Sequence, residues 1–193
     1  MQASGEGLAI FKGDPRSKEH IRRTLDGQDA VLSTLGHTGL GFDTLLADAA
    51  IAMCEAIEDA GIKRLLVVST ALLFRGGGPI AVLLRRIIRH PIRDSRAMED
   101  RIGVSGLEWT IARPRRLVQR DSGFTVLFEG SLRSSMVGIS RKTLAAFLLD
   151  ALEHNEDVRK IVGVFSPRPA KSHVLGMAAG RVPWQRGRAR EKG

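Results

Sequence analysis

The chain has 193 residues and a net charge of +9, with 43% apolar and 26% charged residues, which suits one globular domain with a substantial core. Its single cysteine, Cys54, excludes an internal disulfide and is expected to be a buried thiol. No apolar run approaches the roughly 18 residues that span a bilayer, and the first residues lack a secretory-signal pattern. We therefore expect a cytoplasmic protein without a membrane partner.

The positive charge is concentrated at the C-terminal end. Residues 166–193 contain seven Lys and Arg side chains against one acid, Glu191, and therefore carry +6 of the net +9. We expect a folded domain over residues 1–165 and a flexible basic tail over 166–193. Trp184 is the tail's single aromatic residue, whereas nucleic-acid surfaces interleave aromatic with basic side chains, so a nucleic-acid partner is not expected.

The first elements are short. Leu8–Lys12 is an apolar run closed by the turn residues Gly13, Asp14 and Pro15, which predicts a strand. Ser17 is placed to cap a helix that reaches Leu25.

A second strand is predicted at Ala30–Leu35, followed by a glycine-rich segment over residues 36–41. The helix Asp43–Ala60 has the clearest amphipathic pattern, with Gly61 at its C-terminal end. The continuous apolar run in Arg64–Thr70 predicts a strand buried on both faces, as in a parallel sheet.

In the second half, a basic helix is predicted at Ile80–Arg89, ended by Pro91, with a further helix over residues 95–104. Arg113 and Pro114 stop the strand Glu108–Ala112. The remaining predicted elements are the strand Phe124–Phe128, the helix Arg141–Glu153 capped by Ser140, and the strand Lys160–Phe165. This alternation predicts an α/β fold, with a mostly parallel sheet and helices on both faces.

Several segments in fixed order carry a family resemblance. They are Gly13-Asp14, Leu25–Gly36, Val67–Thr70, Glu99, Ser105–Pro114 and Ile139–Arg141. Together they resemble the atypical, NAD(P)H-binding short-chain dehydrogenase/reductases, the group that includes flavin reductase (biliverdin reductase B) and NmrA-like regulators. The resemblance covers about residues 8–165. It implies an incomplete Rossmann-like domain, an NADP or NAD cofactor, and an unidentified small-molecule substrate.

One part of the family pattern is not found. In that family a strand, a G-x-x-G-x-x-G turn, a helix and a second strand precede the segment that matches Leu8–Lys12, whereas seven residues precede Leu8 here. The turn glycines let the backbone approach the pyrophosphate, and the helix N-terminus supplies N–H donors. Either the sequence is shortened or ordinary cofactor binding is impaired. Residues 36–41, with Gly36, Gly39 and Gly41, could serve as a substitute phosphate loop or as a plain connector.

The resemblance assigns cofactor contacts to five positions. Asp14 would lie near the adenine, although the sequence Gly-Asp-Pro by itself favours a simple turn. The backbone at Leu35 and Gly36 would pass close to the cofactor, at the carboxyl end of its strand. Arg113 and Pro114 match the turn over the nicotinamide, although a proline also simply ends a strand.

Ser69 and Thr70 match the family's active-site hydroxyl and are the candidate catalytic residues; a local backbone contact is the alternative. The sequence contains no tyrosine, which excludes the Ser-Tyr-Lys proton relay of typical short-chain dehydrogenases. In atypical members the hydride donor supplies most of the chemistry. The histidines, among them His37, His90 and His173, show no metal-ligand spacing, so no metal site is expected.

Two functions remain open at this stage: an NAD(P)H-dependent reductase with impaired cofactor binding, inactive in the extreme case, and a non-enzymatic NmrA-like redox-sensing or interaction module. A basic patch at Arg85, Arg86, Arg89 and Arg93 is interpreted as a solvated helix face, with an anion-binding site as the alternative.

Two structural expectations follow. Ser69 and Thr70 should lie at the carboxyl edge of the sheet, at the mouth of a cleft. Leu8–Lys12 should pair directly with Ala30–Leu35, because the two strands that separate them in the complete family fold have no counterpart between them.

Overall fold

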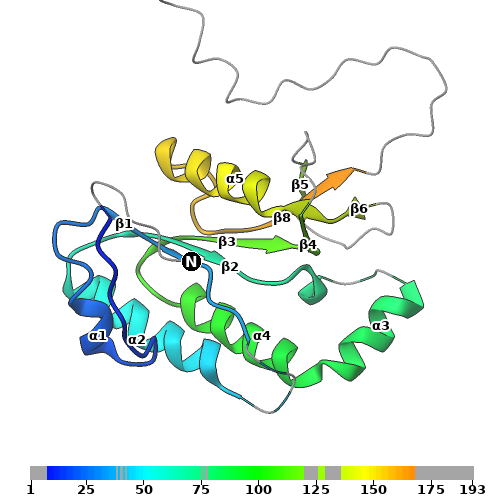
Figure 1. Ribbon diagram of the computed structural model, residues 1–193, viewed down its shortest axis with the longest axis horizontal. Coiled ribbons are helices and arrows are strands. Elements are labelled where there is room, and N and C mark those ends of the chain that lie inside the picture. The colour runs from blue at the N-terminus through cyan, green and yellow to red at the C-terminus, as the bar shows by residue number, and fades with distance from the viewer. Residues whose placement is uncertain are drawn as a thin grey trace, which may run out of the picture.

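The computed structural model describes residues 8–37, 39, 41, 43–74, 76, 78–119, 126–128 and 136–167, and they form an α/β fold around one main sheet (Figure 1). The strands of that sheet are β1 (Ala30–Ser33), β2 (Arg64–Val68), β3 (Glu108–Pro114), β8 (Lys160–Pro167), β5 (Val126–Phe128) and β6 (Met136–Val137). Two further short strands, β4 (Leu117–Val118) and β7 (Ile139–Ser140), pair with each other.

Strands β1, β2, β3 and β8 are parallel neighbours in that order, and β5 and β6 are antiparallel to β8. The helices are α1 (Lys18–Arg22), α2 (Leu45–Asp59), α3 (Gly78–Ile87), α4 (Arg89–Gly103) and α5 (Arg141–Glu153), with a 3-10 turn, η1 (Ala71–Leu73). Helices α1, α2 and α4 cover one face of the sheet and α5 covers the other (Figure 1). The predicted mostly parallel sheet with helices on both faces is confirmed.

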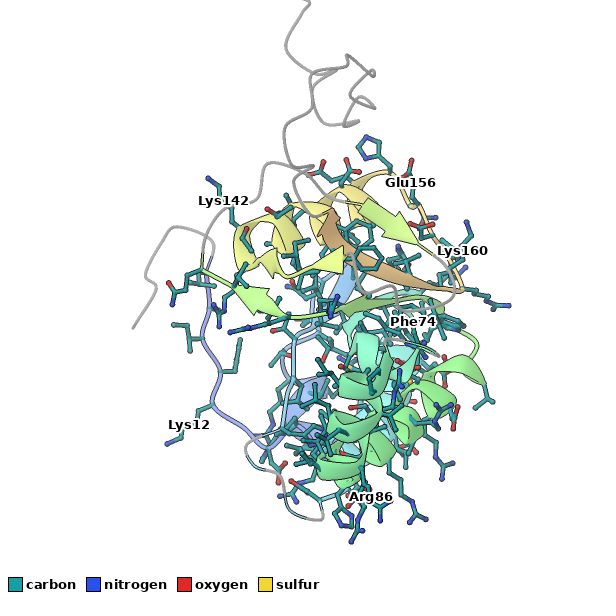
Figure 2. The ribbon with its side chains drawn as sticks, turned by 90° about the vertical axis from the view of Figure 1, so that its right-hand side faces the viewer. Lys12, Phe74, Arg86, Lys142, Glu156 and Lys160 are labelled. Carbon is teal, nitrogen blue, oxygen red and sulfur yellow. The ribbon has the colours of Figure 1, made fainter. Side chains whose placement is uncertain are left out.

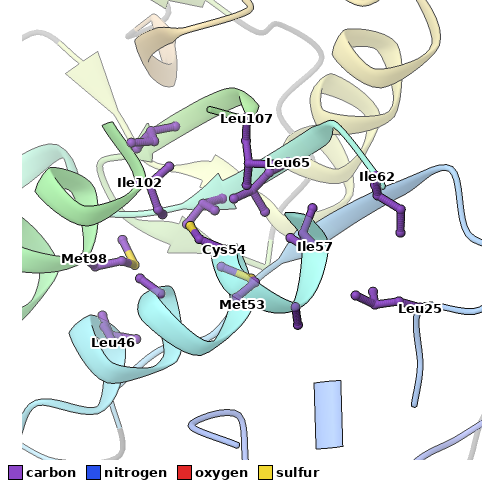
Figure 3. Packing of buried hydrophobic residues seen from close by; sticks show 14 residues of the cluster. Leu25, Leu46, Met53, Cys54, Ile57, Ile62, Leu65, Met98, Ile102 and Leu107 are labelled. Atoms are coloured by element: carbon purple, nitrogen blue, oxygen red, sulfur yellow. The ribbon is translucent and has the colours of Figure 1, made fainter. Parts of the chain in front are cut away.

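Alternate residues of β2 belong to two separate cores. Leu65 and Val67 pack with α2 and α4, whereas Leu66 packs with α5 on the other face. Figure 3 shows Leu65 beside Ile57 of α2 and close to Cys54. The expected buried thiol at Cys54 is confirmed, and burial raises its pKa to about 11.

The predicted helix ends are largely confirmed. The hydroxyl of Ser17 accepts a hydrogen bond from the His20 amide at 3.3 Å, and that of Ser140 accepts one from the Thr143 amide at 3.0 Å. Gly61 follows α2 with a φ of +73°, a conformation that favours glycine.

The prediction that Pro91 ends a helix is wrong. Helix α3 ends earlier, at Ile87, and α4 begins at Arg89, so Pro91 lies in the first turn of α4. A proline fits there because the first amides of a helix have no intrahelical acceptor. The prediction that Arg113 and Pro114 stop the strand at Ala112 is also wrong. Both residues belong to β3, in register with Gly163 and Val164 of β8.

The predicted strand Leu8–Lys12 is also wrong. Residues 8–12 are not part of the sheet, Leu8, Ile10 and Phe11 are exposed, and within the described ranges no strand pairs with the outer edge of β1. Figure 2 shows the segment around Lys12 running apart from the sheet. An apolar run becomes a strand only if its backbone finds a hydrogen-bonding partner. The helix that follows, α1, is held against α2 by an ion pair between Lys18 and Asp59 at 2.8 Å.

Strand β8 extends through Ser166 and Pro167, residues that the sequence assigned to the tail. The rest of the expected tail, residues 168–193, lies outside the described residues, as do residues 124 and 125 of the predicted strand Phe124–Phe128. No helix in the described part of the chain is long and apolar enough to span a membrane.

A buried arginine, Arg64, joins the sheet to α5 at the amino end of the strands. The Arg64 guanidinium donates hydrogen bonds to the Glu108, Ala151 and Glu156 carbonyls at 2.8, 3.1 and 2.9 Å, and to the Thr110 hydroxyl at 2.9 Å. These acceptors belong to β3, to the last turn of α5 and to the loop after it. Burial lowers the pKa of Arg64, but the hydrogen bonds compensate much of its desolvation.

We predict that Arg64→Met destabilises the fold by about 2–4 kcal/mol, because it leaves several buried acceptors without a donor. Urea unfolding followed by circular dichroism measures the effect. The matched control is Lys63→Met at the exposed neighbouring position, which should change the unfolding free energy by less than about 0.5 kcal/mol. Equal effects of the two substitutions would contradict this role of Arg64.

Candidate functional site

The carboxyl ends of β1, β2 and β3 lie at one edge of the sheet, because the three strands are parallel and in register. Gly36 follows β1, Ser69 follows β2, and Arg113 lies near the end of β3. In open parallel sheets this edge is where ligands bind. The structure therefore brings residues of three predicted segments to the same side of the molecule.

A buried carboxylate of α4 connects two of these segments. The Ser69 hydroxyl donates to Oε1 of Glu99 at 2.5 Å. The Arg113 guanidinium donates through Nε to the same oxygen at 2.9 Å, and through Nη2 to the other oxygen of Glu99. Glu99 and Arg113 are both buried. This bidentate ion pair and the serine fix the positions of β2, β3 and α4 relative to one another.

The Arg113 side chain points into the protein. Besides its pair with Glu99, its guanidinium carbon lies 4.6 Å from the centre of the Phe74 ring, a cation–π contact. The arginine charge is therefore used within the fold, and Arg113 and Pro114 are both buried in β3, in register with β8.

The bond to Glu99 defines what Ser69 can do. Since the O–H of Ser69 donates its hydrogen bond to the carboxylate, the hydroxyl oxygen is left with lone pairs that can accept another hydrogen bond. Ser69 is half-buried, so its oxygen is not sealed inside the core. The residue is thus arranged as a hydrogen-bond acceptor for an N–H group and poorly arranged as a proton donor.

Thr70 has a local role. Its hydroxyl accepts a hydrogen bond from the Leu72 amide at 3.3 Å and caps η1, and its side chain is half-buried. The two predicted catalytic residues therefore differ: Ser69 belongs to the Glu99 network, whereas Thr70 makes the local backbone contact that was the alternative.

A second α4 carboxylate occupies the start of α2. The Leu46 amide donates to Oδ2 of Asp94 at 2.9 Å, and the Ala47 amide donates to Oδ1 at 3.0 Å. Asp94 is buried, and Nδ1 of His37 lies 3.7 Å from Oδ2. The Asp94 carboxylate therefore already occupies the N-terminus of α2, which a phosphate loop at residues 36–41 would need for binding an anion.

The remaining predicted cofactor residues are dispersed. Asp14 lies in the turn before α1, where its carboxylate pairs with Arg16 at 2.9 Å, and this hydrogen bond lowers the Asp14 pKa. Leu35 is half-buried against the core. Gly36 is exposed, and a Cβ atom there would meet nothing within 4 Å, so the backbone after β1 is open to a ligand.

Sequence reasoning noted Glu99 as part of a resemblance but did not place it in the site, and it missed Asp94. A signal existed, because both acids lie among the buried positions of α4, with Met98 and Ile102. An acid inside an apolar stripe needs a buried partner, and such partners are often far away in sequence. Among the described residues no three histidine, cysteine, aspartate or glutamate side chains gather as a metal site.

Comparison with known proteins assigns the family. The NAD(P)H-binding family pattern matches residues 1–155, which is most of the chain. The chain belongs to the NAD(P)H-binding family. No curated protein sequence gave a match.

Three solved structures illustrate the fold of this chain. A Rossmann-fold NAD(P)-binding family protein from Shigella flexneri is 24% identical with a TM-score of 0.62, over 86% of this chain and 74% of that one. ChuY, an anaerobillin reductase from Escherichia coli O157:H7, is 16% identical with a TM-score of 0.67, over 87% and 79%. A short-chain dehydrogenase/reductase from Veillonella parvula in complex with NADP is 19% identical with a TM-score of 0.69, over 84% and 74%. The fold is Rossmann-like, as the resemblance implied.

We predict strong coupling between Glu99 and Arg113. Glu99→Met should destabilise the fold by about 3–5 kcal/mol, because it leaves a buried guanidinium without its counterion. The double variant Glu99→Met/Arg113→Met should lose clearly less than the sum of the two single losses, with a coupling of about 1–3 kcal/mol. Urea unfolding of the four proteins gives the cycle. Additive losses would show that the pair does not stabilise the site as a unit.

Proposed function

We propose that this 193-residue chain is a cytoplasmic relative of the short-chain reductases that binds the nicotinamide end of NAD(P)H and holds the rest of the dinucleotide weakly. NAD(P)H would supply a hydride when bound. The protein would supply position through the open backbone at Gly36 and the acceptor oxygen of Ser69. Asp14 takes no part in the proposal, because its carboxylate is already paired in a turn.

The observation that carries the proposal is the unequal fit of the two ends of the cofactor. At the nicotinamide end, Ser69 is held by Glu99 as an acceptor, and a carboxamide offers an N–H donor of that kind. At the phosphate end, the Leu45 amide of α2 is bound to Asp43 and the Leu46 and Ala47 amides are bound to Asp94, so these three first-turn donors are not free for an anion.

The alternative is a non-enzymatic, NmrA-like redox-sensing or interaction module. It is favoured by the chemistry of Ser69, whose proton is committed to Glu99, and by the lack of any tyrosine in the sequence. A protein that binds the cofactor without reducing any acceptor would fit this arrangement. The two functions differ in turnover and share the same binding site.

The first test compares NADPH with reduced nicotinamide mononucleotide, which lacks the adenosine half and the phosphates attached to it. Charge-assisted hydrogen bonds to phosphate contribute on the order of 1.5–3 kcal/mol each, so a complete dinucleotide site strongly prefers NADPH. For this chain we expect weak binding of both compounds, with dissociation constants within about tenfold of each other. Calorimetric titration measures both, and micromolar NADPH binding far tighter than that of the mononucleotide would overturn the proposal.

Ser69→Ala tests the nicotinamide end. The loss of one acceptor should weaken mononucleotide binding by about three- to tenfold, which corresponds to one hydrogen bond. Ser105→Ala is the control, because that hydroxyl binds the Ile102 carbonyl at the end of α4 and lies outside the site. NADPH oxidation with flavin and quinone acceptors then separates the two functions: turnover supports the reductase, and binding without turnover supports the sensing module.

A further inference from the structure

Helix α3 carries an apolar stripe that faces solvent. Ile80, Leu83, Leu84 and Ile87 have the i, i+3, i+4, i+7 spacing that normally directs a helix face toward a core. Here Ile80 is 74% exposed and Leu83 59% exposed, the other two are exposed as well, and Ala81 is the buried residue of the helix. Exposed apolar surface organised in this way marks an interaction site.

The stripe is held outward by contacts on another side of the helix. The Arg85 guanidinium donates to the carbonyls of Leu72 at 2.8 Å and Gly76 at 2.9 Å, and also to that of Phe74. Ala81 packs with Phe74 in a small separate core. At 3.6 residues per turn, Arg85 and Ala81 lie on the side of α3 away from the middle of the stripe. Turning the stripe inward would break these contacts.

Unneutralised arginines flank the stripe. Residues 76–93, which include Arg85, contain no acidic residue. Arg86, Arg89, Arg93 and Arg96 are exposed and repeat every three or four residues from α3 along α4. None of these four forms an ion pair with an acid in the part of the chain that the structure describes. Figure 2 shows Arg86 on the outer side of the helices, away from the sheet.

We propose that α3 and the first half of α4 form a docking surface for an anionic lipid bilayer, with the stripe in the headgroup region and the arginines on lipid phosphates. A short helix with an apolar face and a basic border is suited to this position. In Figure 1, α3 extends to the right of α4, at the end of the helical layer. The net charge of +9 adds long-range attraction to a negative surface.

Charge complementarity selects this occupant. A second copy of the chain, joined through the same stripe by a two-fold axis, would place the same arginines opposite one another. A bilayer supplies apolar depth and negative charge together and needs no matching groove. The contact requires no spanning segment, and it revises the expectation, drawn from the length of apolar runs, that the chain has no membrane partner. It is independent of cofactor binding.

The test is vesicle flotation of the full chain, with phosphatidylcholine vesicles and with vesicles that also contain phosphatidylglycerol. We expect binding to the anionic vesicles, weakened by added salt, and little binding to the neutral ones. Ile80→Ser/Leu83→Ser and Arg86→Gln/Arg93→Gln should each lower the binding constant about tenfold or more, since each basic residue contributes about 1 kcal/mol near such a surface. All four substituted positions are exposed, so the unfolding midpoints of both variants should remain unchanged.

The matched control is Val104→Ser/Lys63→Gln, which removes one exposed apolar and one exposed basic side chain elsewhere and should bind like the wild type. Absence of binding to anionic vesicles, or equal binding by the wild type and both double variants, would overturn the proposal. Light scattering without lipid supplies another decisive outcome. A dimer that Ile80→Ser/Leu83→Ser dissociates would assign the stripe to a second copy of the chain instead.

Discussion

The Glu99 carboxylate lies where β2, β3 and α4 meet, and it is the contact on which the arrangement of the site depends. It binds the guanidinium of Arg113 with both oxygens and accepts a hydrogen bond from the Ser69 hydroxyl. Removing one partner of such a buried pair costs far more than the pair contributes, because a buried charge is left alone. This makes the geometry at the carboxyl edge of the sheet specific, and it turns Ser69 from a donor into an acceptor.

Asp94, also buried on α4, applies the same principle to the start of α2. Its two oxygens bind the first amides of α2, so one helix positions both the end of β2 and the start of the helix after β1. The cost is chemical, because a helix terminus bound to a carboxylate does not offer its amides to a phosphate. Stability at this edge and affinity for the cofactor's pyrophosphate are therefore in competition.

Elements whose pattern is enforced by burial could be predicted from the sequence. The apolar run of β2, the amphipathic stripe of α2 and the serine caps of α1 and α5 were all recognised with small errors at their ends. The strand predicted at Leu8–Lys12 is not formed, because local composition does not determine whether a backbone finds a hydrogen-bonding partner. The helix end predicted at Pro91 was wrong for a related reason. A proline is tolerated in the first turn of a helix and disrupts its interior, and the residue type alone does not show in which of these two places it lies.

The site was predictable in place but not in chemistry. Parallel strands bring their carboxyl ends together, so Ser69, Gly36 and Arg113 could be expected at one edge. The partners of Ser69 and Arg113 could not be read from the sequence, because Glu99 is 30 residues from the serine and 14 from the arginine along the chain. Ser69 and Thr70 are adjacent and similar in type, and only their surroundings give them different roles.

The central claim, that buried α4 carboxylates hold the carboxyl edge together, is tested most directly by amide hydrogen exchange at Leu46 and Ala47. Amides in the first turn of a helix normally lack a hydrogen-bond partner and exchange quickly. Here both should be protected in the native protein, and Asp94→Ala should remove that protection while leaving Ile57, deep in the same helix, still protected. Fast exchange of Leu46 and Ala47 in the unmodified chain would contradict the account.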